Sequence, residues 1–288
     1  MSLATVFSRA LNGMNAPLVE VEAHLANGLP AFNIVGLPDT EVKESRDRVR
    51  AAILQSGFDF PSKKITVNLA PADLPKDSGR FDLPIAIGIL VASGQIMADD
   101  VAQYEFAGEL ALSGRLRPIR GALAMAVACA QSKRAFVLPS ESAEQAALLE
   151  HADIYGAESL SAVAAHLNRV LLLEPVVSVE SNVDLTVLAD LSEVKGQYSA
   201  RRALEVAAAG GHNLLMMGPP GTGKSMLAQR LPSILPPLTL DERLSVASIR
   251  SLLLQHSTEV LPHVRPFQMP HHSASAVALV GGGCQFAK

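Results

Sequence analysis

A run of eight residues in the last third of the chain has the composition and spacing of a phosphate-binding loop. It fits the pattern G-x-x-x-x-G-K-S/T and consists of Gly218, Pro219, Pro220, Gly221, Thr222, Gly223, Lys224 and Ser225. Glycines let a backbone fold around a triphosphate with its N–H groups turned inward. Lys224 is long enough to reach the β and γ phosphates, and the Ser225 hydroxyl can complete the coordination of Mg²⁺. The run therefore predicts a site for ATP and Mg²⁺, with a plain Gly/Pro turn and an incidental lysine as the alternative.

The residues around this loop predict the elements that would position it. Residues 213–217, just before the loop, form a fully apolar run of strand length, and we expect Met216 and Met217 to be core residues. An all-apolar strand suits the middle of a parallel sheet, and its best partner strand within residues 191–288 is the run 276–280. Residues 199–209 are helical and end at Gly210 and Gly211. A second helix follows the loop.

An acidic residue at the end of a second apolar strand normally holds the Mg²⁺ water shell of such a site. After Ser225 no apolar strand ends in this way, because Asp241 and Glu242 start a helix and Glu259 lies in a polar stretch. Residues 191–288 are also few for an ATPase core, since doubly wound domains of this kind are usually nearer ~200 residues. We expect the chain to bind ATP and hydrolyse it poorly, and we assign no catalytic residue.

The composition is that of a globular, mildly acidic protein. Of the 288 residues 49% are hydrophobic and 18% charged, and the net charge is −4. These values exclude a disordered or collagen-like chain and a small, uniformly basic DNA-coating domain, while a local basic groove remains open. Two distant cysteines, Cys129 and Cys284, favour a reducing compartment, and neither a secretory signal nor a membrane-spanning run is found. We expect a cytoplasmic protein with no membrane partner.

The pattern from residue 18 to about residue 173 alternates between short strands and helices, which predicts an α/β domain. We expect strands at residues 19–22, 64–69 and 135–138, helices at 40–55, 83–93 and 121–130, and half of a hairpin at 105–112. A further helix opens at Ser140 with the spacing of a capping box. Residues 174–190 carry no helical period, so we place a linker there, between a domain of residues 1–173 and a second domain of residues 191–288.

Five stretches, spread over nearly the whole chain, resemble the signatures of one family. They are residues 29–38 (LPAFNIVGLP), 68–73 (NLAPAD), 75–84 (PKDSGRFDLP), 194–197 (VKGQ) and 270–275 (PHHSAS). The family is that of the magnesium-chelatase-like AAA+ ATPases of bacteria, in its ComM-like or YifB-like branch. The resemblance implies an α/β chain in which a Lon-protease-like domain, of the ribosomal protein S5 domain 2 type, precedes the N-terminal part of a P-loop AAA+ domain.

The resemblance also implies a function. Full-length relatives act on DNA as homo-oligomeric, ring-shaped motors that drive branch migration during recombination in natural transformation. By the same resemblance Gly196 and Gln197 lie near the adenine of ATP, with a plain helix-entry turn as the alternative. The family continues after residues 281–283 into the second ATPase strand and its acidic pair, so we expect this chain to be truncated before that acid.

Two other functions remain open for such a chain. One is a magnesium-chelatase-type motor subunit that acts on a protein partner, and the other is a truncated nucleotide-binding module without turnover. A salt-dependent mobility shift of DNA would separate the DNA motor from the chelatase-type subunit. Phosphate release would separate both motors from the module without turnover.

The first half of the chain also contains stretches that raise the question of a peptidase function. Residues 75–77, 106–109, 117–119 and Gly121 resemble the stretches of Lon protease that carry its serine nucleophile and lysine base. The spacing places Asp82 or a neighbour at the serine position and Leu123 at the lysine position. Leucine cannot take up a proton, so we expect this domain to be catalytically inert.

Two further groups of residues are weaker candidates for a functional site. A zinc site could be assembled from His263, His271, His272 and Cys284, but the adjacent histidines diverge and no C-x-x-C pair anchors the set, so these histidines are better explained as loop residues. The densest basic region outside helix 40–55 is either a solvated face or a DNA-contacting surface; it comprises Arg115, Arg117, Arg120, Lys133 and Arg134.

Overall fold

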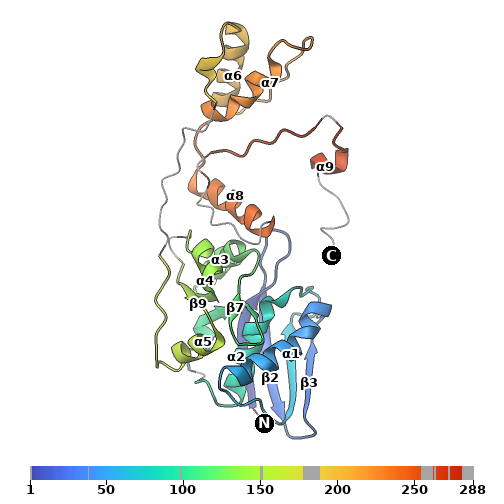
Figure 1. Cartoon of the computed structure of the whole chain (residues 1–288), viewed down its shortest axis with the longest axis vertical. Helices are drawn as coiled ribbons and strands as arrows, with labels where there is room; N and C mark the ends of the chain where they lie inside the picture. Colours follow the sequence, from blue (N-terminus) through green and yellow to red (C-terminus); the bar gives the residue numbers. More distant parts are fainter. Residues whose placement is uncertain are drawn as a thin grey trace. The chain divides into compact units, whose positions relative to one another are not determined.

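The computed structural model describes residues 2–37, 39–97, 99–149, 152–177, 189–253, 262, 264–271 and 273–280. Its internal contacts divide the chain into two compact units, here called unit 1 and unit 2 (Figure 1). Unit 1 comprises Met1–Val179 and Ala247–Glu259, and unit 2 comprises Glu180–Val246 and Val260–Lys288. In the part of the chain that is described, no helix has both the length and the apolar character needed to cross a bilayer.

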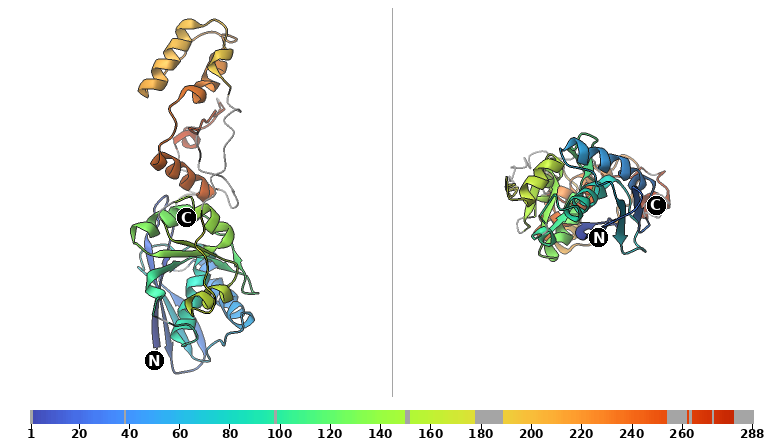
Figure 2. Two further views of the ribbon diagram at one scale, coloured as in Figure 1. Left: turned by 90° about the vertical axis from the view of Figure 1, so that its left-hand side faces the viewer. Right: turned by 90° about the horizontal axis from the view of Figure 1, so that it is seen from below.

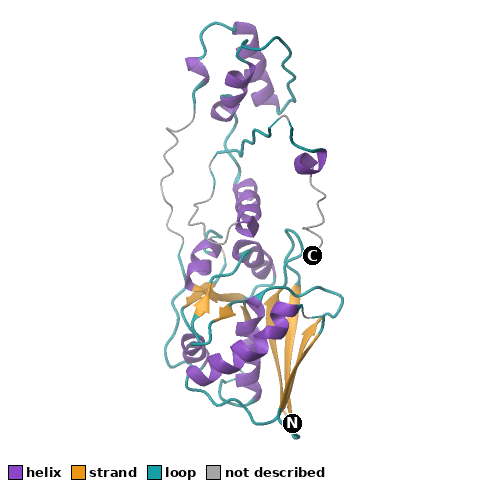
Figure 3. Ribbon diagram, turned by 45° about the vertical axis from the view of Figure 1, so that its right-hand side comes forward, coloured by secondary structure: helices purple, strands orange, loops and turns teal. Residues whose placement is uncertain are grey.

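Unit 1 is built on a seven-stranded mixed sheet with the strand order β3-β4-β2-β1-β5-β8-β9 (Figure 3). Strands β1, β2 and β4 pair in antiparallel fashion, and all other neighbours are parallel. A separate two-stranded sheet joins β6 and β7. The strands are β1 Ser2–Arg9, β2 Leu18–Ala26, β3 Ala31–Val35, β4 Lys64–Ala70, β5 Tyr104–Phe106, β6 Glu109–Leu110, β7 Leu116–Arg117, β8 Ala135–Pro139 and β9 Ile154–Ala157.

Five helices pack on this sheet and complete an α/β unit, as predicted. They are α1 Thr40–Gln55, α2 Asp82–Ala92, α3 Ala122–Gln131, α4 Ser140–Ala146 and α5 Leu160–Leu167. Helices α1 and α2 lie side by side (Figure 2), and α2 packs against β1 and β2. Gly88 allows this approach, since a Cβ at that position would lie 3.2 Å from the Cβ of Ala23. The predictions of strands 19–22, 64–69 and 135–138 and of helices 40–55, 83–93 and 121–130 are confirmed.

Helix α1 shows why the sequence pattern was informative. The Asp39 side chain caps its first turn by accepting a hydrogen bond from the Val42 N–H at 2.9 Å. Val42, Val49 and Ile53 are fully buried on one face, at the spacing of a helix that contacts the core along one stripe. The opposite face is charged. Helix α1 therefore presents charged side chains to solvent while its apolar stripe packs in the core of unit 1.

One local prediction in unit 1 is wrong. Helix α4 does begin at Ser140, but its N-cap residue is Pro139, which makes no side-chain capping bond. Instead the hydroxyl of Ser142 accepts a hydrogen bond from the Ile119 N–H at 3.0 Å. The predicted cap is absent because Ser140, which would have to supply its oxygen, is the first residue of the helix and not the N-cap residue.

A buried ion cluster lies at the centre of the sheet of unit 1. Arg9, the last residue of β1, donates from Nε and Nη2 to the two carboxylate oxygens of Glu105 on β5, at 2.6 and 2.8 Å. Arg134, just before β8, donates to the same carboxylate at 3.3 Å and stacks over the ring of Phe7. The Glu105 side chain is fully buried, so these arginines are needed to neutralise it.

Unit 2 is smaller and mainly helical. Its elements are the short helical turns Leu191–Glu193 and Leu231–Ile234 and the helices α6 Tyr198–Gly210, α7 Lys224–Gln229, α9 Ala276–Val280 and the first half of α8 Leu240–Leu253. A small core is formed by Leu191, Val194, Leu204 and Leu227. The predicted helix 199–209 and its glycine end are confirmed, because Gly211 caps α6 with a φ of 64°.

Two strand predictions in unit 2 are wrong. Residues 213–217 are not a strand, and residues 276–280 form helix α9. Met217 is 85% exposed, whereas Met216 is partly buried against the small core. A parallel strand needs a neighbour for its N–H and C=O groups, and the described residues of unit 2 contain no strand that could supply one. Apolar character alone was therefore not enough to make this run a strand.

The predicted linker at residues 174–190 is described only at its two ends. Val176 donates its N–H to the carbonyl of Ile154 at 2.8 Å, and Pro175 bridges to Tyr155, so residues 175 and 176 extend the contacts of unit 1. Residues 178–188 lie outside the described part of the chain. The domain boundaries drawn from the sequence stay a prediction.

We expect Arg9→Ala to lower the free energy of unfolding of unit 1 by about 3–5 kcal/mol, because it leaves the buried Glu105 carboxylate without its two closest donors. Urea denaturation followed by circular dichroism measures the change. The control is Arg169→Ala, which removes an exposed arginine from its pair with Asp100 and should cost much less, because solvent screens that pair. Equal losses in the two variants would contradict the importance of the buried cluster.

The surroundings of His166 on α5 make the stability of unit 1 depend on pH. Its Nδ1 accepts a hydrogen bond from the Leu173 N–H at 3.0 Å, its Nε2 lies 3.2 Å from the Tyr104 hydroxyl, and burial lowers the pKa of the imidazole. The unfolded chain therefore takes up the proton first, so stability is complete above a pH of about 6.5 and falls as the pH drops toward the lowered pKa of the folded state.

We expect His166→Gln to reduce this pH dependence, since the amide can keep both contacts without titrating. The loss accumulates as the pH falls from about 6.5 toward the lowered pKa of His166 in the folded state. The measurement is urea denaturation at about pH 7 and at about pH 5.5, with His212→Gln in unit 2 as the control. An unchanged pH dependence in His166→Gln would refute this assignment.

Candidate functional site

The predicted phosphate-binding residues form an exposed loop that runs directly into helix α7. Gly221 and Gly223 have φ angles of 82° and 84°, a conformation that side-chain-bearing residues rarely adopt. Space does not demand glycine at position 221, since a Cβ there would meet nothing within 4 Å. The backbone conformation is therefore the reason for glycine in this loop, as the motif predicts.

Lys224 folds back into the loop that precedes it. Its ammonium donates to the carbonyl oxygens of Gly218 and Pro219, at 2.8 Å each, and to the hydroxyl of Thr222 at 3.3 Å. The Thr222 hydroxyl in turn donates to the Pro219 carbonyl at 3.0 Å. The loop thus curves around one positive charge, which is held by three oxygen atoms.

The structure brings Gln197 to the same loop. Gly196 and Gln197 both have positive φ angles, of 67° and 52°, and Gln197 is the residue from which α6 starts. The side-chain amide of Gln197 donates to the carbonyl of Thr222 at 3.4 Å. The helix-entry turn is therefore observed, and the turn also lies beside the predicted phosphate-binding loop. Contact of Gly196 and Gln197 with adenine stays a prediction.

The acidic residues that follow the loop are engaged elsewhere. Asp241 and Glu242 lie in the first turn of α8, as predicted, and Glu242 accepts a hydrogen bond from the Thr239 N–H at 2.9 Å. Arg265 donates to both carboxylate oxygens of Glu242 at 3.0 Å. These bonds lower the pKa of Glu242. Glu259 lies outside the described residues.

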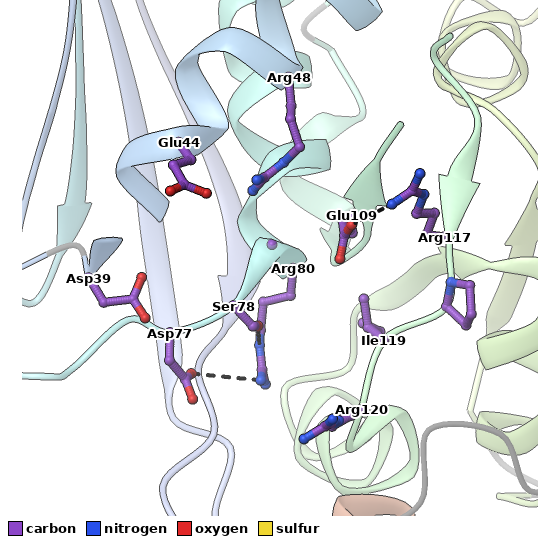
Figure 4. Close-up of a pocket in the computed structure, with 12 residues that line it drawn as sticks. Asp39, Glu44, Arg48, Asp77, Ser78, Arg80, Glu109, Arg117, Ile119 and Arg120 are labelled. Atoms are coloured by element: carbon purple, nitrogen blue, oxygen red, sulfur yellow. Dashed lines mark hydrogen bonds and ion pairs between the residues drawn. The ribbon is translucent and has the colours of Figure 1, made fainter. Parts of the chain in front are cut away.

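Unit 1 contains a separate charged pocket of about 760 Å³ (Figure 4). Glu44 and Arg48 of α1 lie on one side of it, Glu109 and Arg117 of β6 and β7 on the other, and Arg80 between them. Four arginines and four carboxylates line this pocket, together with smaller residues: Asp39, Glu44, Arg48, Asp77, Ser78, Gly79, Arg80, Glu109, Arg117, Pro118, Ile119 and Arg120. Arg117 pairs with Glu109 at 3.4 Å, so part of this charge is already paired within the pocket wall.

The position that resembles the protease serine is occupied by a buried carboxylate. Asp82 accepts hydrogen bonds from the Ser45 hydroxyl, from Arg48 Nε at 2.7 Å and from the Leu110 N–H at 3.2 Å. Burial raises the pKa of Asp82, although the bonds from Arg48 and Ser45 act in the opposite direction. Asp82 thus fixes α2 to α1 and to β6. Neither Ser45 nor Arg48 was singled out from the sequence, because the bond to Asp82 joins residues far apart in the chain.

No serine–lysine pair is found around Asp82 in the described structure. Leu123, at the position that resembles the lysine base, is only 1% exposed within α3. Lys76, in the stretch 75–77 that resembles Lon protease, is the one lysine here with a pKa lowered by burial, and its ammonium donates to the carbonyl of Pro71. Its partner is a backbone oxygen, so this lysine serves to anchor the loop.

The weaker groups from the sequence do not form one site. Among the residues that the structure describes, no three His, Cys, Asp or Glu side chains lie together as metal ligands. His271 bonds to Ser273 at 2.7 Å, whereas His263, His272 and Cys284 lie outside the described residues, so zinc is not tested. The basic region divides in the structure, because Arg134 belongs to the buried cluster and Arg117 to the pocket of Figure 4.

Comparison with known proteins finds one family over most of the chain. Residues 21–142 match the family described as subunit ChlI of Mg-chelatase, and residues 190–288 match magnesium chelatase, subunit ChlI. The chain is 50% identical to the competence protein ComM of Haemophilus influenzae over 287 residues and 50% identical to the uncharacterized protein YifB of Salmonella typhimurium over 283 residues. Each match covers 98% of this chain and 56% of the relative, so the chain spans a little over half the length of these relatives.

We expect purified protein to show no peptidase activity, because the hydroxyl that bonds to Asp82, that of Ser45, is fully buried and out of reach of a peptide. Hydrolysis of fluorescent casein measures it, with Ser78→Ala as the variant that removes the hydroxyl lining the pocket. Cleavage by the unchanged protein that disappears in Ser78→Ala would overturn this prediction, since a contaminating protease would act equally in both samples.

Proposed function

We propose, from the premise that this chain belongs to the magnesium chelatase ChlI family, that it is the ATP-binding part of an AAA+ motor protein that acts on DNA. The family predicted from the five sequence stretches is thereby confirmed. One relative bears the name competence protein, which supports the DNA side of the proposal. The proposal includes a cytoplasmic location, a homo-oligomeric ring and a role in branch migration during recombination. It also assigns residues 1–173 to the Lon-protease-like fold, in an inert form.

The observation that supports the proposal best is the ammonium of Lys224, held at 2.8 Å from two carbonyl oxygens of its own loop. A cation inside a glycine-containing loop is the arrangement that receives a chain of phosphates, because phosphate oxygens can replace the loop oxygens as acceptors for the same donor. The residues present therefore fit ATP. In the proposal Lys224 binds the phosphates and Ser225 holds Mg²⁺.

Two residues of the α6 entry turn complete the proposed nucleotide site. Gln197 already contacts the loop through the Thr222 carbonyl, and Gly196 precedes it in the same turn. In the proposal these two residues contact the adenine end of the nucleotide. ATP, when bound, would supply the free energy of phosphoanhydride hydrolysis that a motor of this family uses.

The 288-residue chain is proposed to turn ATP over slowly. The Glu242 carboxylate is paired with Arg265 through two bonds of 3.0 Å and caps α8, so it is unsuited to hold a metal-bound water beside Ser225. Phosphate release measures this turnover. Rapid, Mg²⁺-dependent release by this chain would contradict the assignment of an incomplete hydrolytic half.

We expect Lys224→Ala to weaken binding of a fluorescent ATP analogue by about tenfold or more, since a hydrogen bond to a charged group contributes about 1.5–3 kcal/mol. Fluorescence titration with Mg²⁺ present measures the affinity. Arg202→Ala is the matched control, because it removes an exposed cation of the same unit that pairs with Glu205. Unchanged affinity in Lys224→Ala would refute the nucleotide site.

The DNA side of the proposal needs its own experiment. A mobility shift with branched and linear DNA, repeated at increasing salt, measures whether the chain binds DNA through phosphate contacts. The proposal expects a shift that weakens with salt. Binding that is absent even at low salt would overturn the DNA role for this chain while leaving the nucleotide site untouched.

A further inference from the structure

A second cavity of unit 1, of about 400 Å³, lies between helix α1, the start of β3 and the turn before β4. It shares no lining residue with the pocket of Figure 4, although α1 contributes to both. Its volume is at the lower end of the range for small-ligand sites. It is lined by Pro30, Ala31, Phe32, Arg46, Asp47, Arg50, Phe60, Pro61, Ser62 and Lys63.

The charge of this cavity is mainly positive. Arg46, Arg50 and Lys63 contribute three cations, and Asp47 contributes the single carboxylate. All four side chains are exposed, so their charges reach the solvent at the cavity mouth. The pocket of Figure 4 differs in this respect, because its arginines and carboxylates are equal in number. An anionic ligand is therefore favoured at the cavity between α1 and β3.

Aromatic rings form the floor between these cations. The rings of Phe32 and Phe60 lie 5.8 Å apart, and the guanidinium of Arg50 lies over the Phe60 ring at 5.4 Å from its centre. Both phenylalanines are partly buried and pack against the core of unit 1. Their positions are consequently set by the core, and two tilted aromatic rings with one stacked guanidinium line the cavity.

From this combination we infer that the cavity between α1 and β3 binds single-stranded nucleic acid. Cations at the mouth contact phosphates, and an unpaired base stacks on the surface formed by Phe32, Phe60 and Arg50. A single strand is required because the bases of a duplex are already stacked on each other and offer no free face. The inference deepens the DNA role put forward under Proposed function and names a surface for it outside the nucleotide-binding unit.

The test uses the whole 288-residue chain, without nucleotide, and a fluorescein-labelled oligothymidylate of about 20 nucleotides, longer than the roughly 4–16 nucleotides that one small single-strand-binding fold covers. Fluorescence anisotropy at several salt concentrations gives the affinity and its salt slope. The double variant Arg50→Glu with Lys63→Glu should weaken binding by about tenfold or more. It should also reduce the salt slope by about 1.4, or about 0.7 for each lost phosphate contact.

The matched control is Arg115→Glu with Arg120→Glu. Both arginines are exposed, belong to the other basic region of unit 1 and produce the same change in net charge. We expect the control to bind the oligothymidylate within about twofold of the unchanged chain, because these residues are not part of the cavity between α1 and β3.

A third variant, Phe32→Leu, separates stacking from charge. Leucine keeps an apolar side chain against the core but offers no ring, so affinity should fall by about fivefold or more with an unchanged salt slope. Thermal unfolding of each variant verifies that unit 1 is folded. Binding of the fluorescent ATP analogue should be the same in all three variants.

The outcomes separate this inference from the function on which it rests. Equal weakening by the two charge-reversed pairs, or weakening by Arg115→Glu with Arg120→Glu alone, overturns the cavity as the binding surface and leaves the DNA role standing. An unchanged affinity in Phe32→Leu overturns base stacking there. Failure of the unchanged chain to bind any DNA overturns both the inference and the DNA role, whereas loss of nucleotide binding in Lys224→Ala concerns the phosphate loop alone.

Discussion

The buried carboxylate of Glu105 is the interaction on which unit 1 depends. It lies on β5, a strand of three residues that joins the antiparallel strands β2 and β1 to the parallel strands β8 and β9. Arg9 reaches it from β1 and Arg134 from the start of β8, so three neighbouring parts of the sheet meet at one charge. A buried charge is tolerated only with such partners. These ion pairs hold the short strand β5 in the sheet in addition to its few backbone bonds. Helix α2 packs on β1 and β2, so the same part of the sheet positions this helix.

The backbone hydrogen bonds of the two units are made in different ways. In unit 1 the sheet satisfies the strands and supports the helices that carry Asp82 and the charged pocket of Figure 4. The described part of unit 2 contains no sheet beneath the loop of residues 218–225, and the apolar residues 213–217 do not form a strand. The loop nevertheless has its curved form, because the bonds of Lys224 and Thr222 join residues that are close in sequence. Loop shape can be specified by neighbours in sequence, whereas a parallel strand requires a distant one.

The positions of the charged residues say more about possible binding surfaces than the net charge does. A net charge of −4 gives no sign of an anion-binding surface, yet three exposed cations gather around two phenylalanine rings between α1 and β3. A few residues away along α1, Arg48 is turned to the buried Asp82, and Arg134 is enclosed in the sheet. Residues of one type thus have three roles, set by the elements that surround them. A basic residue in this chain is informative only when its partners are known.

The sequence alone determined the helices and strands whose pattern is local, such as α1, α2, β2 and β4, and the positive φ angles of the loop at Gly221 and Gly223. The family was also recognised from five stretches of the sequence, and the 50% identity to the competence protein ComM agrees with it. Tertiary structure decided the rest. It decided that residues 213–217 are not a strand, that 276–280 are helical, that Ser142 bonds to Ile119, and that Asp82 meets Ser45 and Arg48. The physical reason is that periodicity reports which face of a segment is apolar, while strand pairing, buried charge and pockets depend on groups that only folding brings within bonding distance.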